Sequence, residues 1–578
     1  MGGDVARLRN MATTTYMSSV DDARRGLVRY PPDFEHQYRS AGFWTRRSLP
    51  AELMFAASAH ASEQALVTAE GTWSYQELFV AAQKFAGGLL TSTRLRPGDA
   101  VMFQMGNVAE TVVSYLGCLL AGIRPVCTLP QHGVREISVL AKHIGARGLI
   151  IQADFGRGQL PTNARALVNS GIIQDVVVAR GFAEGFGVSY QQLLASSGPA
   201  LATALPYHHC DPRQIAVFQL SGGTTGLPKI APRLHEEYAY NSRAWADTMG
   251  WGTGSRILYP LPIMHNAGIS VALQPALLSG ATLVLSHSAD IDTLLGLIES
   301  TRPDALPLVP PTLAIRLLDH PRSRNTDLSS IKDFIVGGQR LAEEVAERLR
   351  DELNITVRHK FGMSEGMFLL TPAQADENVR HHTVGKPLSP ADEIRILRPG
   401  QDVEVESSEI GELCVRGPYT IRGYYRAKQH NAHAFTTDGF YRTGDLARRH
   451  TYDGETYYSI EGRIKDIINR GGEKIHANEV EELMMRHPDV SNAALVAMPD
   501  RVLGEKGCAY LALEGESTSL TVQSLGEFLL EQGLAKYKLP ERVEIVPALP
   551  MSSVSKVSKK TLREDIESKL ARENASSS

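Results

Sequence analysis

The sequence predicts an α/β protein with a large N-terminal domain of mostly parallel sheets, a β-rich subdomain and a small α+β C-terminal domain. Three observations support this prediction. Between residues 75 and 220, strand-like and helical segments alternate with short turns rich in glycine and proline, which is typical of βαβ units. Near residues 385–425 the pattern changes to short segments with alternating apolar side chains. After Lys465 a compact mixture of helices and strands of about 110 residues follows, which is a common domain size.

Hydrophobic periodicity predicts the elements of the N-terminal part. Residues 75–90 carry apolar side chains at helical spacing. Residues 111–123 form an apolar stretch that is too short to cross a membrane and therefore predicts a buried helix. Short apolar runs between turns predict buried strands of a parallel sheet. We expect these strands at residues 99–104, 123–129, 148–152, 173–179 and 214–220.

The later elements are shorter and more regular in their alternation. Residues 393–397 and 411–416 predict antiparallel strands. Beyond Lys465, helices are expected at residues 478–486 and 521–532, and strands at residues 492–497, 508–513 and 542–546. We therefore predict a disordered segment at residues 1–20, an N-terminal domain at residues 21–464 and a C-terminal domain at residues 465–578.

Composition and charge restrict the class of function. The 578 residues contain 60 Lys and Arg against 64 Asp and Glu, a net charge of −4. This balance argues against a protein that mainly coats nucleic acid or an anionic membrane. The first 20 residues lack the apolar core of a secretory signal. Five cysteines, none of them in a C-x-x-C pair, argue against a disulfide framework or a structural zinc site. We expect a cytoplasmic protein.

The strongest chemical signal is the segment SGGTTGLPK, which follows the apolar run IAVFQL. Its glycines let the main chain approach a ligand closely and adopt positive φ. Its hydroxyl groups, its N–H groups and its final lysine together suit a polyphosphate. The predicted phosphate-binding residues are Ser221, Gly222, Gly223, Thr224, Thr225, Gly226 and Lys229.

This segment resembles the phosphate loop of the adenylate-forming superfamily, which includes acyl-CoA synthetases, luciferases and the adenylation domains of peptide synthetases. Three further segments occur in the order that this family requires. FGMSEG (361–366) resembles its Y/F-G-x-T-E motif, and YRTGDL (441–446) resembles its Y-R-T-G-D motif. GRIKD (462–466) and NRGGEKI (469–475) resemble its hinge and the following loop. The similarity covers about residues 25–565.

The resemblance implies a reaction that depends on ATP and Mg²⁺, in which a carboxylate attacks the α-phosphorus of ATP. Charge spreads over the phosphoryl oxygens in such a transfer, so the protein supplies cations and positioning. By this resemblance Glu365 would help hold Mg²⁺, Asp445 would accept hydrogen bonds from the ribose hydroxyls, and Arg463 would contact the nucleotide. Gly338 and Gln339 would lie in the turn that stacks against adenine.

The same resemblance assigns a catalytic lysine and a hinge to the C-terminal part. Lys556, in the segment LPMSSVSK, corresponds to the lysine that bridges the acid and the α-phosphate. Ser555 stands where the family usually has glycine, and the nearby Lys559 and Lys560 compete for the role. Rotation of a mobile C-terminal domain about Lys465 would then open a channel for a pantetheine thiol.

The segment LPIMHNAGIS (261–270) resembles the aryl-acid AMP ligases that feed siderophore-type peptide synthetases. The characteristic feature of this segment is the pair His265-Asn266. By this resemblance His265 is a candidate catalytic residue, and the Asn266 amide would bind the carboxylate and the ortho-hydroxyl of the acid. Ala267 replaces an aromatic residue of this branch, and Val271 replaces a serine that reaches a second hydroxyl. We therefore expect salicylate, or a larger or amino-substituted aryl acid, rather than 2,3-dihydroxybenzoate. Other predicted substrate-binding residues are Gly337, Gly362 and Met363.

The sequence thus predicts an enzyme that activates an aromatic acid as acyl-AMP and passes the acyl group to the phosphopantetheine thiol of an aryl carrier protein. An aryl-CoA ligase that uses free coenzyme A shares the first step, and the sequence does not separate the two. An esterase is a third interpretation, because GMSEG matches the G-x-S-x-G elbow of α/β-hydrolases, with Ser364 as nucleophile. No nucleic-acid or membrane partner is predicted.

Overall fold

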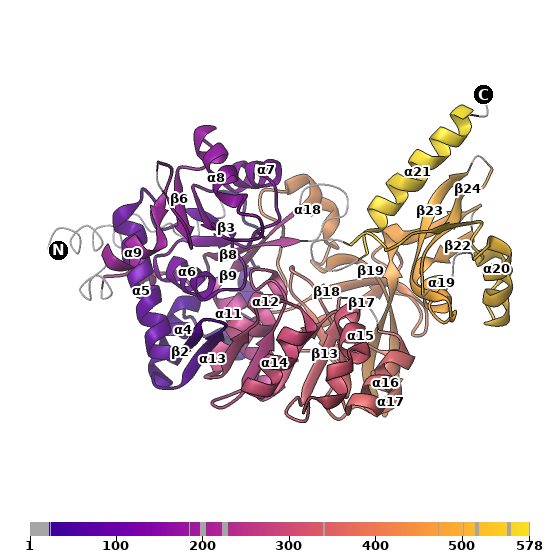
Figure 1. Ribbon diagram of the computed structural model, residues 1–578, viewed down its shortest axis with the longest axis horizontal. Helices are drawn as coiled ribbons and strands as arrows, with labels where there is room; N and C mark the ends of the chain where they lie inside the picture. Colours follow the sequence, from indigo (N-terminus) through magenta and orange to yellow (C-terminus); the bar gives the residue numbers. More distant parts are fainter. Residues whose placement is uncertain are drawn as a thin grey trace.

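The computed structural model describes residues 22, 25–183, 185–196, 204–221, 229–338, 341–471, 473–500, 502–514, 520–551 and 557–576. The segment 1–20, predicted to be disordered, lies outside these residues. Figure 1 shows a broad N-terminal body and a smaller C-terminal lobe, coloured orange to yellow. The predicted α/β class, with a large domain of mostly parallel sheets, a β-rich part and a small C-terminal domain, is confirmed.

A seven-stranded sheet has the order β7-β6-β5-β3-β4-β8-β9. Its pairs are parallel except for β8 and β9, which are antiparallel. The apolar runs of the sequence form these strands, although β4 is shorter than predicted. The strands are β3 (Ala100–Gln104), β4 (Arg124–Val126), β5 (Gly148–Gln152), β6 (Asp175–Ala179), β7 (Val188–Ser189), β8 (Ile215–Ser221) and β9 (Lys229–Leu234).

A nine-stranded sheet has the order β16-β15-β14-β13-β12-β10-β11-β1-β2. Its six central strands, from β14 to β1, are parallel, and both edges are antiparallel. The strands are β1 (Gln64–Thr68), β2 (Gly71–Ser74), β10 (Arg256–Tyr259), β11 (Thr282–Leu285), β12 (Ala305–Val309), β13 (Asp333–Gly337), β14 (Val357–Gly362), β15 (Phe368–Leu370) and β16 (Lys386–Pro387).

Helices α5 (Tyr75–Ser92), α6 (Ala109–Leu120) and α11 (His235–Met249) share one apolar core with both of these sheets. Helix α5 begins where predicted because Ser74 and Glu77 form a capping box. No helix in the described part of the chain is both long and apolar enough to cross a membrane. The other helices of the N-terminal part are α3 (Pro32–Ser40), α4 (Leu49–Ala59), α7 (Val134–Ile144), α8 (Leu160–Asn169), α9 (Tyr190–Ser196), α12 (Asn266–Gly268), α13 (Gln274–Ser279), α14 (Ile291–Thr301), α15 (Pro311–Asp319), α16 (Glu343–Leu353), α17 (Glu377–His382) and α18 (Lys428–Ala434).

The β-rich part is a four-stranded antiparallel sheet of β17 (Glu393–Leu397), β18 (Gly411–Arg416), β19 (Tyr441–Tyr452) and β20 (Glu455–Arg463). It extends beyond the predicted residue 425 because β19 and β20 form a long hairpin. Asp453 and Gly454 close this hairpin, and both have positive φ, as a two-residue turn of type I′ requires.

The C-terminal sheet has the order β22-β21-β24-β23, with β25 beside β24. Two separate apolar clusters line it, one with side chains from α19 and α20 and the other with side chains from α21. Strands β23 and β24 are longer than predicted, and α21 is an additional helix. The elements are β21 (Ile467–Arg470), β22 (Glu473–His476), α19 (Ala477–Met484), β23 (Val490–Asp500), β24 (Gly504–Leu513), α20 (Val522–Glu531), β25 (Arg542–Ile545) and α21 (Lys559–Ser576).

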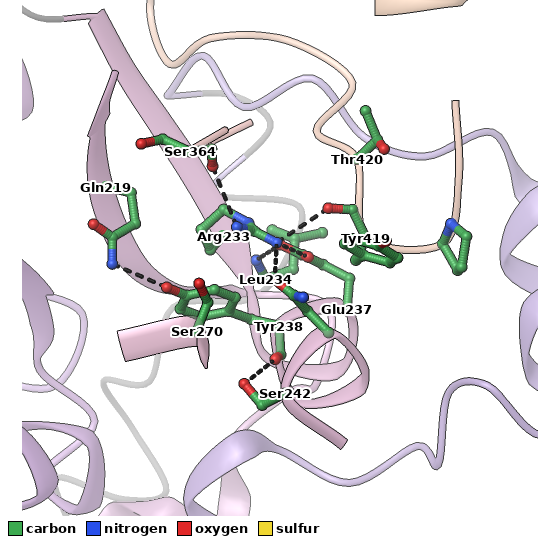
Figure 2. Close-up of polar contacts among 12 residues, drawn as sticks. Gln219, Arg233, Leu234, Glu237, Tyr238, Ser242, Ser270, Ser364, Tyr419 and Thr420 are labelled. Carbon is green, nitrogen blue, oxygen red and sulfur yellow. Dashed lines mark hydrogen bonds and ion pairs between the residues drawn. The ribbon is translucent and has the colours of Figure 1, made fainter. Parts of the chain in front are cut away.

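A buried ion pair joins the three sheets of the N-terminal part (Figure 2). The guanidinium of Arg233, on β9, binds the carboxylate of Glu237 through two hydrogen bonds of 3.0 and 2.8 Å. It also donates to the carbonyl of Ser364, after β14, at 3.2 Å and to the carbonyl of Tyr419, after β18, at 3.1 Å. One fully buried side chain therefore fixes the relative positions of three segments that lie far apart in sequence.

A second polar cluster ties the four-stranded sheet to β15. The phenol of Tyr419 donates to Asp392 Oδ2 at 2.6 Å and accepts from the N–H of Phe368 at 3.1 Å. The N–H of Ser389 also donates to Asp392 Oδ2, at 3.0 Å. Burial raises the pKa of the Asp392 carboxyl to about 7, because it disfavours the charged form.

We predict that Arg233→Met lowers the stability of the N-terminal domain by about 3–5 kcal/mol, because it leaves the Glu237 carboxylate buried without its cation. Thermal unfolding followed by circular dichroism measures this effect. The double variant Arg233→Met/Glu237→Gln is the control, and it should recover part of the loss because it removes the uncompensated charge. An unchanged melting temperature in the single variant would contradict the role of the pair.

Protonation of Asp392 predicts a pH dependence of stability. Because its pKa is higher in the folded protein than in the unfolded chain, stability falls as pH rises from about 4 to about 7. Asp392→Asn should abolish this pH-dependent change in the free energy of unfolding, which amounts to about 2–4 kcal/mol. The melting temperature of the variant should therefore rise relative to wild type between pH 4 and pH 7. Parallel pH curves for the two proteins would refute this role.

Candidate active site

The ends of β8 and β9 form the base of the predicted phosphate loop. These strands are antiparallel, and Ser221 pairs with Lys229 in the ladder. The five predicted loop residues between them lie outside the described residues: Gly222, Gly223, Thr224, Thr225 and Gly226. The ammonium of Lys229 lies 5.2 Å from the ring centroid of Tyr424. Burial lowers the pKa of Lys229, and the negative charge of Glu365 opposes that shift. The cation therefore lies within electrostatic reach of Glu365.

Glu365 follows β14 and is buried. Its Oε1 accepts a hydrogen bond from the phenol of Tyr424, whose oxygen is 2.7 Å from the phenol oxygen of Tyr441. The carbonyl of Glu365 accepts from the N–H of Ile421 at 2.8 Å. Gly366 has φ +101°, and a Cβ there would lie 1.9 Å from the carbonyl oxygen of Tyr419, so only glycine fits. The motif thus packs directly on residues 419–424.

The surroundings of Glu365 fit a magnesium ion that is shared with a nucleotide. Mg²⁺ is usually held by one or two carboxylates together with phosphate oxygens, rather than by a cage of protein ligands. Glu365 is such a carboxylate, buried beside the base of the predicted phosphate loop. Within the described ranges, no group of three or more His, Cys, Asp or Glu side chains is placed to hold a metal ion. The donor set suits a metal that needs phosphate ligands.

Asp445 and Arg463 are direct neighbours across β19 and β20. Arg463 Nε lies 2.9 Å from Asp445 Oδ1, and the adjacent Asp445 raises the pKa of Arg463. Lys465, the predicted hinge residue, follows two positions later, and burial lowers its pKa to about 8. Asp466 pairs with Arg563 of α21 at 3.0 Å, which links this segment to the C-terminal helix. The structure therefore places both predicted nucleotide residues next to the predicted hinge.

The predicted adenine turn lies at the carboxyl end of β13. A Cβ on Gly337 would lie 2.9 Å from Leu308 and 3.0 Å from the carbonyl oxygen of Lys360, so little space remains beside the main chain. Gly338 has φ +92°, which favours glycine. Gln339 lies outside the described residues. Gly362 ends the neighbouring strand β14, so these glycines share the edge where ligands of open parallel sheets bind.

His265 and Asn266 begin the short helix α12. His265 Nδ1 accepts from the N–H of Ala267 at 3.3 Å. The helix continues into a turn of π-helix at Ile269–Leu273, labelled η2, which contains Val271. Such turns occur often at functional sites. The Asn266 amide is buried and donates to the carbonyl of Met363 at 3.4 Å. The structure therefore brings together two residues that were predicted separately as substrate-binding.

Two residues beside Gly362 were missed by the sequence analysis. A Cβ on Gly362 would lie 2.4 Å from the ring of Phe368 and 3.3 Å from Cε of Lys360. The buried ammonium of Lys360 lies 4.5 Å from the ring centroid of Phe368 and 5.1 Å from that of Trp245. No local signal singled out Lys360, because the strand segment VRHKFG also carries Arg358 and His359. The position of Phe368 depends on the fold of β15 against β14.

The predicted catalytic lysine, Lys556, lies outside the described residues, and Met551 pairs with Val557 across that gap. The two competing lysines both have carboxylate partners. Lys559 lies 2.7 Å from Glu481, and Lys560 lies 3.7 Å from Glu564.

Ser364 does not have the surroundings of a hydrolase nucleophile. Its hydroxyl donates to the carbonyl of Leu220 at 2.9 Å, and its own carbonyl accepts from Arg233. A main-chain carbonyl cannot take a proton as a general base. Ser364 instead connects β8 to the segment that follows β14.

Most of the chain matches known protein families. Residues 55–425 match the AMP-binding enzyme family, and residues 479–556 match the AMP-binding enzyme C-terminal domain. The chain is 39% identical to "Pyochelin synthase PchD" of Pseudomonas aeruginosa, over 96% of this chain and 98% of that protein. It is 37% identical to the 2,3-dihydroxybenzoate-AMP ligase of Bacillus subtilis, over 94% of this chain and 98% of that protein.

A solved structure shows the same architecture. The apo structure of Mycobacterium smegmatis MbtA matches with a TM-score of 0.71 and 35% identity, over 93% of this chain and 98% of that chain. The resemblance that the ordered motifs indicated is thus confirmed over nearly the whole length. The chain therefore belongs to the AMP-binding enzyme family of adenylate-forming enzymes.

Proposed function

We propose that this protein is an aryl-acid AMP ligase that uses ATP and Mg²⁺ to convert an aromatic acid into its acyl-adenylate. One observation carries the proposal. The segment 363–365 lies between the two halves of the site, since the carbonyl of Met363 accepts from Asn266 while Glu365 and Lys229 both contact Tyr424. An acid held at Asn266 and a phosphate held at Lys229 would therefore be neighbours. The similarity to a 2,3-dihydroxybenzoate-AMP ligase supports an aromatic acid.

The proposed residues act by holding charge and orienting groups. The Lys229 ammonium, with the hydroxyl and N–H groups of the loop, would stabilise negative charge on the phosphates. Glu365 would hold Mg²⁺, which neutralises phosphate charge when bound. Asp445 would orient the ribose and Arg463 would contact the nucleotide. The acid's carboxylate would attack the α-phosphorus with loss of pyrophosphate, and Lys556 would bridge these two groups.

The second half-reaction would pass the acyl group to the phosphopantetheine thiol of a carrier protein. The similarity to a pyochelin synthase supports a synthetase context. We place the division between the two domains at residues 464 and 465, with Lys465 as the hinge of a mobile C-terminal domain. The ion pair of Asp466 with Arg563 would keep the segment after the hinge attached to that domain as it turns.

We predict ATP–pyrophosphate exchange that depends on an aryl acid. The panel contains benzoate, salicylate, 2,3-dihydroxybenzoate, anthranilate and 3-hydroxyquinaldate. The ortho-hydroxy acids salicylate and 3-hydroxyquinaldate should support exchange, whereas benzoate should be weaker because it lacks a group for Asn266. 2,3-Dihydroxybenzoate should be weaker than salicylate, since Val271 cannot pair its second hydroxyl. Folded protein without exchange on any of these acids would refute the proposed function.

The acceptor is tested separately. Acyl-adenylate formed from salicylate is offered either to phosphopantetheinylated carrier protein or to free coenzyme A, and thioester is measured. Loading of the carrier protein at a much higher kcat/KM supports the proposal. Preference for free coenzyme A would make the protein an aryl-CoA ligase instead.

Lys556→Ala should lower acyl-adenylate formation by about 10²-fold or more, because a cation beside the developing phosphoryl charge is lost. Thioester formation from pre-made acyl-adenylate should be nearly unchanged. Lys559→Ala is the matched control, since Lys559 pairs with Glu481, and it should retain exchange activity. If Lys559→Ala loses exchange activity and Lys556→Ala keeps it, the catalytic lysine is Lys559 and not Lys556.

A further inference from the structure

Three buried side chains form a hydrogen-bonded chain that ends at the proposed acid site. Gln219 Nε2 lies 3.0 Å from the phenol oxygen of Tyr238, and this phenol lies 3.0 Å from Asn266 Oδ1 (Figure 2 shows Gln219 and Tyr238). Their exposed fractions are 1%, 0% and 4%. We call these three residues the amide relay. They come from β8, α11 and α12, so only the fold brings them together.

The chemistry of the neighbours fixes the direction of every bond in the amide relay. The carbonyl of Met363 can only accept, so the atom of Asn266 that faces it must be the amide nitrogen. The amide oxygen then faces Tyr238, and the phenol must donate its single proton to it. Gln219 must therefore donate to the phenol oxygen. The hydroxyl of Ser270 does not alter this, because it donates to the main-chain carbonyl of Asn266 at 2.7 Å.

We infer that the amide relay commits Asn266 to act as a hydrogen-bond donor toward the acid, so that the site selects an ortho-hydroxy over an ortho-amino aryl acid. This inference rests on the proposed function, which places the acid at Asn266. The amide oxygen is engaged by Tyr238, and one N–H is directed to Met363. The second N–H is the group left for a ligand, and it requires an acceptor.

The two classes of acid differ at this position. In an ortho-hydroxybenzoate the phenolic proton is donated within the molecule to the carboxylate, so the phenolic oxygen can still accept. In an ortho-aminobenzoate the nitrogen lone pair is delocalised into the ring, and a second N–H points outward. That N–H would face the N–H of Asn266, and two buried donors would be left without an acceptor. Leaving these buried polar groups unpaired should lower kcat/KM for the ortho-aminobenzoate by about tenfold or more relative to the ortho-hydroxybenzoate.

The test compares kcat/KM for salicylate and for anthranilate in ATP–pyrophosphate exchange. Wild type should prefer salicylate by at least about tenfold. Tyr238→Phe removes the donor that holds the amide oxygen, so the ratio should fall about tenfold. The decrease in this ratio should come mainly from a lower kcat/KM for salicylate. Tyr240→Phe is the matched control on the same helix, because its hydroxyl lies 2.7 Å from Ser389 instead. This control should keep the wild-type ratio.

Gln219→Glu tests the direction of the hydrogen bonds in the amide relay. It is the second variant, used if Tyr238→Phe fails to fold. A carboxylate at position 219 would accept the phenolic proton, so the phenol oxygen would face Asn266 as an acceptor. The amide would then turn its nitrogen toward Tyr238 and its oxygen toward the acid, giving up its 3.4 Å bond to Met363, and the ratio should shift toward anthranilate. An equal loss of activity on both acids in these variants, with the ratio unchanged, would show a merely structural role and overturn the inference.

The failure of this inference differs from the failure of the proposed function. Wild type that uses salicylate and anthranilate equally well would overturn only the selection by the amide relay. Wild type without exchange on any aryl acid would overturn the proposed function, and the inference would fall with it.

Discussion

The buried pair of Arg233 and Glu237 is the interaction on which the site geometry depends. A guanidinium in an apolar interior is tolerated only when its donors are satisfied, and here carbonyl groups from the segments that follow strands of two other sheets complete its shell. One of those carbonyls belongs to Ser364, which lies between Met363 and Glu365. The ion pair therefore fixes the segment that carries one contact of the proposed acid site and the proposed metal ligand.

Burial explains why the polar groups of this site have defined directions. Glu365, Tyr424 and Tyr441 form one hydrogen-bonded group beside Lys229, and the amide relay forms another beside Met363. In a low-dielectric interior an unpaired donor or acceptor is costly, so each group adopts the orientation that pairs it. Orientation of this kind is what an enzyme needs where charge develops during phosphoryl chemistry. The same pairing that stabilises the fold thus prepares the site.

Much of the fold could be predicted from local patterns. Helix α5 and strands β5, β17 and β18 lie close to their predicted limits, because periodicity, caps and turns are written in neighbouring residues. The extent of β19 and β20 and the π-helical turn at η2 could not be predicted, since they depend on pairing and packing with distant segments. Among the proposed site residues, the motifs pointed to Glu365 and Asn266, but no local pattern pointed to Lys360 or Phe368.

The sequence by itself determined the family, the order of the motifs and the kinds of side chain that we propose for phosphate, metal and acid. It did so because a phosphate loop or a Y-R-T-G-D segment is contiguous in the chain. The tertiary structure decided how those side chains face one another. Gln219, Tyr238, Asn266 and Met363 span about 145 positions, and only their packing fixes which atom of the amide is presented to the site. Hydrogen-bond direction depends on partners in space, so the sequence alone could not supply it.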